Sequence, residues 1–107
     1  MIGLVGEMSF EIQVNEQNIG LEIKGGVTAR DVGEMARALA ASLKSGSTVV
    51  LETAGLEDVD TSVLQMLVSL RKTVSALLVE NPSEVFVNAV DRCALRRELL
   101  GAAREPL

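Results

Sequence analysis

The sequence predicts one α/β domain with a mixed four-stranded sheet and three main helices. Two short segments near the N-terminus alternate apolar and polar residues, which is typical of strands. Longer segments repeat apolar residues every three or four positions, which is typical of helices. A nearly continuous apolar run lies between the first two helical segments. A chain of 107 residues is long enough for one domain with its own core and too short for two. The predicted domain spans residues 1–107 in the order β-β-α-β-α-β-α, with its core at about residues 9–101 and frayed ends at residues 1–7 and 104–107.

The first two strands are predicted from residues 9–15 and 21–25. In the first segment, Phe10, Ile12 and Val14 lie on one face and polar residues lie on the other, which is typical of a half-buried strand at or near a sheet edge. The second segment alternates in the same way after the polar turn EQNIG. Because a short connection joins two alternating segments, we expect an antiparallel hairpin.

A helix and a central strand are predicted next. Gly25 and Gly26 indicate a turn, since they match no phosphate-binding glycine loop. Thr28 is the expected N-cap of an amphipathic helix that Gly46 closes. The apolar stripe of this helix comprises Val32, Met35, Ala36, Leu39 and Leu43. Residues 48–53, TVVLET, form a nearly continuous apolar strand, which favours a central position in the sheet.

The C-terminal half is predicted to add a helix, a strand and a last helix. The apolar stripe of the first of these helices comprises Val63, Met66, Leu67, Leu70, Val74 and Leu77. Residues 83–90, SEVFVNAV, indicate the fourth strand, and residues 91–103 indicate the third helix, with Asp91 as its N-cap and Gly101 as its end. Strand-helix-strand units of this spacing favour right-handed crossovers and parallel pairing, so the sheet is expected to be mixed.

Composition excludes several classes of function. The formal charge of −5 disfavours general affinity for nucleic acid or anionic membranes, since both repel an acidic domain. The absence of histidine excludes Ser-His and Cys-His catalysis, imidazole metal sites and histidine phosphorelay on this chain. Cys93 is the single cysteine, so no internal disulfide forms, and we expect a small buried core residue in a reducing compartment.

The sequence also indicates where the protein resides. No apolar run approaches the length of a membrane-spanning helix, and no charged-then-apolar leader precedes the first strand. We therefore expect a cytoplasmic protein that does not insert into membranes. Without a Walker or Rossmann loop, we expect no cofactor.

Acidic and hydroxyl residues gather where the central strand passes into the second helix, at Asp58, Asp60, Thr61 and Ser62. One interpretation is local, because Ser62 and Gln65 match the Ser-x-x-Gln capping box and acids favour a helix N-terminus. The other interpretation is functional. A hydroxyl at an exposed helix start is accessible to a partner, and a phosphate added there concentrates negative charge on one surface spot. The residues alone leave both interpretations open.

Asp58 and Asp60 are also the candidates for a phospho-acceptor or magnesium site. A response-regulator receiver resembles a fivefold β-α repeat with an acidic pair after the first strand and a late lysine, whereas no lysine follows Lys72 here. Nothing else in the sequence marks a metal cage. We therefore expect no metal site and no catalytic residue.

The same junction resembles the signature of STAS domains, the family of bacterial anti-sigma-factor antagonists. Members carry a strand like VVLET, then a loop like L-x-x-V-D-S/T-S/A-G-L and a helix, and this chain has LEDVDTSVL. The resemblance covers roughly residues 9–101 in element order, and the matching signature residues are Val59, Asp60, Thr61, Ser62 and Leu64. Val63 departs from the signature, because the family usually has glycine there, and its side chain alters how closely a partner approaches the helix start.

The resemblance implies a STAS-like fold and a regulatory protein-binding module rather than an enzyme. In the sigma-factor version, the unphosphorylated antagonist binds an anti-sigma factor that is also a Ser/Thr kinase, phosphorylation ends the binding, and a phosphatase restores it. Thr61 occupies the position of the family's phosphorylated hydroxyl, with Asp60 as its supporting acid and Ser62 as the second choice. The implied partner-binding residues are Asp58, Asp60, Thr61, Ser62, Val63 and Gln65.

Relatives serve other machines, which supplies an alternative function. Some STAS domains are small cytoplasmic subunits of ATP-driven phospholipid transporters, and those often carry threonine in the signature, as this chain does at Thr61. Others accompany chemosensory or stress-signalling complexes. The implied partner is then a transporter ATPase or another subunit of such a complex.

Overall fold

A computed structural model describes residues 9–16, 18–44 and 46–101 of the chain, so the predicted frayed ends lie outside the described residues. Its main sheet has four strands, which follow one another across the sheet as they do along the chain. They are β1 (Phe10–Asn15), β2 (Asn18–Ile23), β4 (Thr48–Glu52) and β6 (Ala76–Glu80). The pair β1 and β2 is antiparallel, whereas β4 runs parallel to both β2 and β6. The predicted hairpin and the predicted mixed four-stranded sheet are therefore confirmed.

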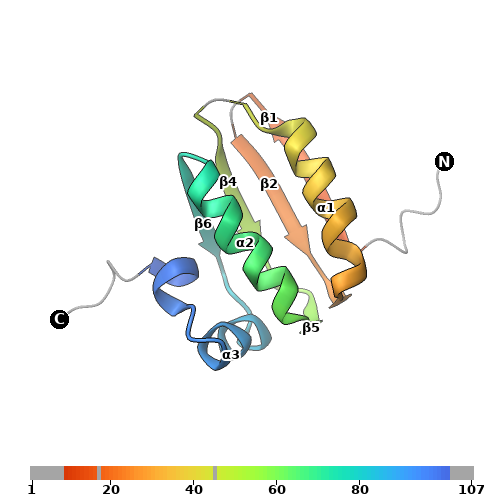
Figure 1. Ribbon diagram of the computed structural model, residues 1–107, viewed down its shortest axis with the longest axis vertical. Helices are drawn as coiled ribbons and strands as arrows, with labels where there is room; N and C mark the ends of the chain where they lie inside the picture. Colours follow the sequence, from red (N-terminus) through yellow and green to blue (C-terminus); the bar gives the residue numbers. More distant parts are fainter. Residues whose placement is uncertain (1–8, 17, 45, 102–107) are drawn as a thin grey trace.

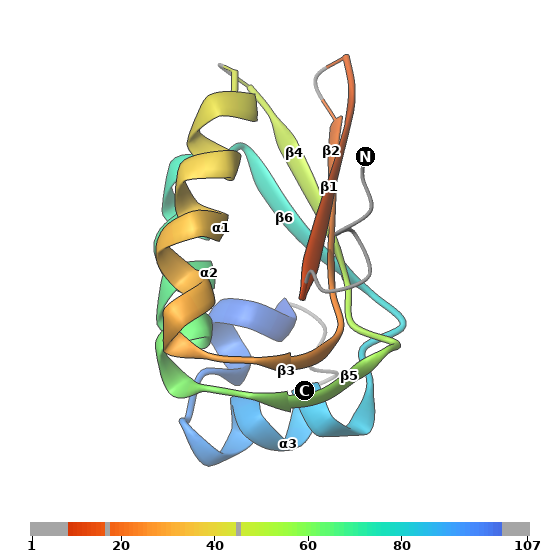
Figure 2. The ribbon, with the colours of Figure 1, turned by 90° about the vertical axis from the view of Figure 1, so that its right-hand side faces the viewer.

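Two helices cover one face of this sheet: α1 (Ala29–Ser42) and α2 (Thr61–Thr73) lie side by side over it (Figures 1 and 2). At the lower end, two short strands, β3 (Gly25–Val27) and β5 (Leu56–Val59), form a separate parallel pair. Below this pair lies α3 (Glu84–Arg92), and the chain then forms a single turn of π-helix, η2 (Arg97–Gly101).

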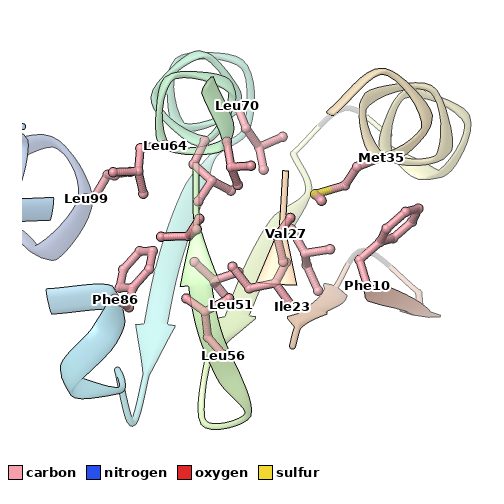
Figure 3. Packing of buried hydrophobic residues seen from close by; sticks show 14 of the residues in the cluster. Phe10, Ile23, Val27, Met35, Leu51, Leu56, Leu64, Leu70, Phe86 and Leu99 are labelled. Atoms are coloured by element: carbon pink, nitrogen blue, oxygen red, sulfur yellow. The ribbon is translucent and has the colours of Figure 1, made fainter. Parts of the chain in front are cut away.

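The hydrophobic core lies between the main sheet and the helices. Leu64 and Met35 point from α2 and α1 toward the sheet, and Phe86 reaches the same core from α3 (Figure 3). Only two aromatic residues are present in the chain, so aliphatic side chains fill most of this space. The buried apolar residues of the sheet are Phe10, Ile19, Leu21, Ile23, Val49 and Leu51.

The first helix has the predicted N-cap. The Thr28 backbone N–H donates to Asp31 Oδ2 over 2.8 Å, so an acid in the first turn satisfies a donor at the helix start. The helix ends at Ser42, before the predicted end at Gly46. Gly46 instead has φ of +81° in the following turn, a conformation that glycine adopts without the strain that a Cβ would bring.

The strands β3 and β5 were not predicted from the sequence. Gly25 and Gly26 were expected to form a turn, but they belong to β3, where the Gly25 N–H donates to Gly55 O over 2.9 Å. The strand is irregular at these glycines, because Gly25 has φ of +66° and the register shifts between Gly25 and Gly26. The predicted acidic loop is β5, which pairs with β3 and leads directly into α2.

The predicted fourth strand at residues 83–90 is wrong, because this segment forms α3. Phe86, Ala89 and Val90 are its buried residues, and this spacing is helical rather than alternating. Ser83 is its N-cap, whose Oγ accepts from the Phe86 N–H over 3.1 Å. The fourth strand is β6 instead. The sequence pattern places Leu77 of this strand on the apolar stripe of the second helix, because its spacing from Leu70 and Val74 is helical. Parallel pairing with β4 supplies its hydrogen bonds and decides against continuation of the helix.

The last predicted helix is also displaced. Asp91 lies inside α3 rather than capping a new helix, and Ala94, with φ of +59°, turns the chain after α3 ends. The Arg96 guanidinium then donates twice to the Asp91 carboxylate, over 2.8 and 2.9 Å, which folds this link back onto α3. Residues 97–101 form η2, whose Leu99 is buried in the core.

Candidate functional site

The pair of short strands places two helix starts next to each other. Val27 of β3 lies opposite Val59 of β5, and each strand is followed within two residues by a helix. The Asp60 N–H donates to Val27 O over 3.0 Å, which continues the ladder up to the first residue before α2. Since both strands run in the same direction, the N-termini of α1 and α2 emerge on the same side of the domain (Figure 2).

Helix α2 begins with a cap different from the predicted one. Asp60 is the N-cap, and its Oδ1 accepts from the Ser62 backbone N–H over 3.0 Å and from the Ser62 hydroxyl over 3.1 Å. The predicted capping box of Ser62 and Gln65 is therefore wrong. The negative Asp60 side chain also complements the positive end of the helix dipole. The aspartate of the signature thus holds both the backbone N–H and the hydroxyl of Ser62 at the helix start.

Thr61 is the first residue of α2, and its side chain is exposed. Its Oγ1 lies 3.7 Å from Cys93 Sγ, at the C-terminal end of α3. This is a contact between segments 32 residues apart. The hydroxyl therefore faces solvent next to a second element of the fold, and a partner bound over it would cover both.

Val63 does not belong to the exposed part of the site. Its side chain is 0% exposed and packs in the core with Leu64, Leu67 and Leu70, the inward face of α2. The expectation that Val63 contacts a partner is therefore corrected, because a buried side chain presents no surface to one. Valine at this position contributes to holding α2 against the sheet.

The other predicted contact residues lie together on the surface. Asp58 is exposed near the end of β5, where its Oδ1 accepts from the next backbone N–H, that of Val59, over 3.0 Å. Gln65 is exposed one turn into α2, on the same side of the helix as Thr61. Asp60 is exposed and Ser62 is half-buried. The α2 docking surface, as we name it, consists of Asp58, Asp60, Thr61, Ser62 and Gln65.

The α2 docking surface carries two carboxylates, two hydroxyls and one amide. No group of acidic or cysteine residues able to hold a metal ion occurs among the described residues. A phosphate on Thr61 would stand beside Asp60 and near Asp58, and would add negative charge to a surface that is already acidic. Because Thr61 is exposed, this addition requires no rearrangement of the core.

A comparison with known protein families decides what the domain is. The family model described as "Mlab, STAS domain" matches residues 10–103, which is most of the chain. The chain belongs to the STAS domain family. The predicted resemblance is thereby confirmed, together with the α/β fold expected of a STAS domain. Domains of this family mediate protein–protein interactions in general.

Two further comparisons add less. A solved structure entitled "Crystal Structure Analysis of Mglu" is similar to this STAS domain with a TM-score of 0.57 and 20% sequence identity. The match covers 70% of this chain and only 20% of that chain, so it concerns the fold alone. The comparison with curated proteins finds no match. Among the described residues, no helix is both long and apolar enough to cross a bilayer.

Sequence reasoning missed one neighbour of the site. Cys93 was expected to be a buried core residue, but it is half-buried and contacts Thr61. The contact between Cys93 and Thr61 could not be predicted because residues 83–90 were assigned to a strand. Cys93 was then placed near the start of the next helix rather than at the C-terminal end of α3. A helical assignment from Ser83, based on its capping pattern, would have brought Cys93 to the end of a helix.

Proposed function

We propose that this STAS domain is a regulatory protein-binding module of the anti-sigma-factor antagonist type, switched by phosphorylation of Thr61. The observation that carries the proposal is the exposed hydroxyl of Thr61 at the start of α2, directly after an aspartate that fixes the helix start. The partner is an anti-sigma factor that is also a Ser/Thr kinase, and a phosphatase restores the binding form. The module itself is not an enzyme, and it acts in the cytoplasm.

The physical reason for a switch is local charge. The unmodified α2 docking surface carries the acids Asp58 and Asp60 and the neutral residues Thr61, Ser62 and Gln65. Phosphorylation adds almost two negative charges and three acceptor oxygens at its centre. A partner surface that fits the neutral hydroxyl loses that fit, because the added group is larger and repels any acid facing it. Binding ends without unfolding of the domain.

A second candidate function is favoured by the threonine itself. STAS subunits of ATP-driven phospholipid transporters resemble this chain in having threonine in the signature. In that role, or in a chemosensory or stress-signalling complex, the α2 docking surface holds its partner permanently. Thr61 then acts as a contact residue rather than as a phosphate acceptor.

Affinity capture with matched baits tests the two functions. The baits are the unmodified domain, Thr61→Glu and Thr73→Glu, the last of which places the same charge at the far, exposed end of α2. We expect a kinase-type anti-sigma factor with the unmodified and Thr73→Glu baits, and its loss with Thr61→Glu. Equal recovery of transporter subunits by all three baits would establish the second function and refute the switch.

The acceptor assignment is tested separately by phosphopeptide mass spectrometry of protein isolated from its own cells. We expect phosphate on the peptide that contains Thr61 and Ser62, and its loss in Thr61→Ala. The variant Ser62→Ala serves as the matched control, because it removes the neighbouring hydroxyl. If Thr61→Ala incorporates as much phosphate as the unmodified protein, Thr61 is not the acceptor.

A further inference from the structure

The main sheet has one face that no described element covers. Helices α1 and α2 lie on one side of it, and the opposite side carries neither helix nor strand within the described residues (Figure 2). Side chains alternate accordingly: Leu21 and Ile23 are buried toward the helices, whereas Glu22 between them points the other way. This uncovered sheet face is on the far side of the sheet from α2.

A row of four glutamates crosses the uncovered sheet face. The strand register pairs Glu11 with Glu22, Glu22 with Glu52, and Glu52 with Glu80, so each strand contributes one carboxylate. Neighbouring strands lie about 4.8 Å apart, which places like charges directly opposite each other. Within residues 9–16, 18–44 and 46–101, none of the four forms a salt bridge with Lys or Arg. We name these residues the glutamate row.

A hollow lies beside the glutamate row. Two residues before Glu22, on the same face of the sheet, Gly20 lies between Gln13 and Val50, and these residues line an open hollow of about 230 Å³. Three of the glutamates, Glu11, Glu22 and Glu52, also line it, and Val50 supplies an apolar wall. The hollow thus combines aliphatic surface with carboxylates at its border.

The apolar part of this face continues toward β6. Leu78 is 51% exposed and belongs to the same register row as Gly20 and Val50. An exposed leucine beside four carboxylates suits a side chain that is itself apolar along its stem and positive at its tip. Lysine and arginine have this construction, since their methylene stems pack on apolar surface while the charge reaches a polar border.

We propose that the uncovered sheet face docks a basic segment of a partner protein, with one Lys or Arg side chain inserted in the hollow over Gly20. The positive tip lies among Glu11, Glu22 and Glu52, and its stem packs on Val50. Charge complementarity selects this occupant. A second copy docked face to face through the same sheet would present the same glutamates and be repelled, and residues 1–8 contain no Lys or Arg.

This surface does not depend on the proposed function of Thr61. The α2 docking surface lies at the helix start, whereas the glutamate row lies across the opposite side of the sheet. Two partners therefore have separate surfaces on one domain. A STAS domain with both surfaces occupied connects the partner of α2 to a basic protein segment.

A hexa-arginine peptide serves as the probe in a titration followed by ¹⁵N-HSQC spectra at low ionic strength, where exposed charges are least screened. We expect saturable binding, with the largest shifts at the amides of Gly20, Glu22, Val50 and Glu52. The double variant Glu22→Gln with Glu52→Gln should raise Kd about tenfold, since it removes two charges that border the hollow. The control, Glu34→Gln with Glu84→Gln, removes two exposed charges elsewhere and should leave Kd within about twofold.

A further variant separates shape from charge. Gly20→Val places three additional carbons at the floor of the hollow and changes no charge, and a Cβ at Gly20 meets only Gln13 atoms at 4.0 Å, so the strand accommodates it. We expect Gly20→Val to weaken peptide binding about threefold or more. The proposal is overturned if the largest shifts fall on Asp58, Asp60 and Thr61, if no saturable binding occurs, or if both sheet-face variants bind as the unmodified protein does.

Discussion

Neutralising the middle of the glutamate row should make the free protein more stable. The register contains three adjacent pairs of carboxylates, and Glu22 or Glu52 belongs to every one of them. Like charges directly opposite each other on neighbouring strands destabilise by about 0.2–1 kcal/mol per pair. The double variant Glu22→Gln with Glu52→Gln removes all three pairs, so we expect a gain of about 0.6–3 kcal/mol in the free energy of unfolding. For a domain of this size, each 1 kcal/mol raises Tm by about 4–8 °C.

Urea unfolding followed by far-ultraviolet circular dichroism measures this gain, since the chain has no Trp or Tyr to serve as a fluorescence probe. The same measurement in about 1 M salt should show a smaller gain, because the screening length of about 3 Å is then shorter than the distance between strands. The control is Glu34→Gln with Glu84→Gln, which reduces the net charge equally. A double variant that is no more stable than this control at low salt would refute the calculation.

Three other predictions concern the helix ends. Thr53→Val should lower the free energy of unfolding by about 1–3 kcal/mol in urea titrations, because Thr53 is buried and its Oγ1 accepts from the Ser83 N–H over 2.9 Å. Asp60→Ala should lower the free energy of unfolding by about 0.5–2 kcal/mol, because it removes the N-cap of α2. Asp60→Asn should retain most of the stability, since asparagine also caps helices. Equal losses of stability in the two variants would show that the cap is not the cause. The hydrogen bond from the Arg96 guanidinium holds the pKa of Asp91 below its usual range; a smaller desolvation effect opposes this shift, and the charge of Arg96 adds to it. Because the folded pKa is lowered, this contribution to stability is present above the usual range and is lost as pH falls through the lowered value. Tm measured against pH should therefore fall less steeply on the acid side for Asp91→Asn than for the unmodified protein, and parallel curves would contradict the assignment.

The elements with local signals were the ones that the sequence predicted well. The alternation around Phe10 and Leu21 and the apolar run at residues 48–53 decided three strands of the main sheet. The errors arose where tertiary pairing decides the state of a short segment. Residues 76–80 continue a helical apolar stripe, and only the parallel partner β4 makes them a strand. The three residues of β3 are too few to show any period.

The sequence was sufficient to identify the residues of the candidate site, but not which of them are buried or which other segments they contact. Thr61 and Asp60 stand out in the sequence because acids and hydroxyls concentrate there, and both lie where a helix begins. Burial of Val63 required knowledge of which face of α2 meets the sheet. The contact with Cys93 and the alignment of the glutamate row depend on segments far apart in the chain, and no local pattern encodes either.

The strand order of the main sheet has a consequence for synthesis on the ribosome. Because β1, β2, β4 and β6 leave the ribosome in the same order in which they stand in the sheet, each new strand joins an edge that already exists. No strand has to be inserted between two earlier ones. The nascent chain therefore extends its sheet in one direction, and the last edge becomes available only when residues 76–80 have emerged.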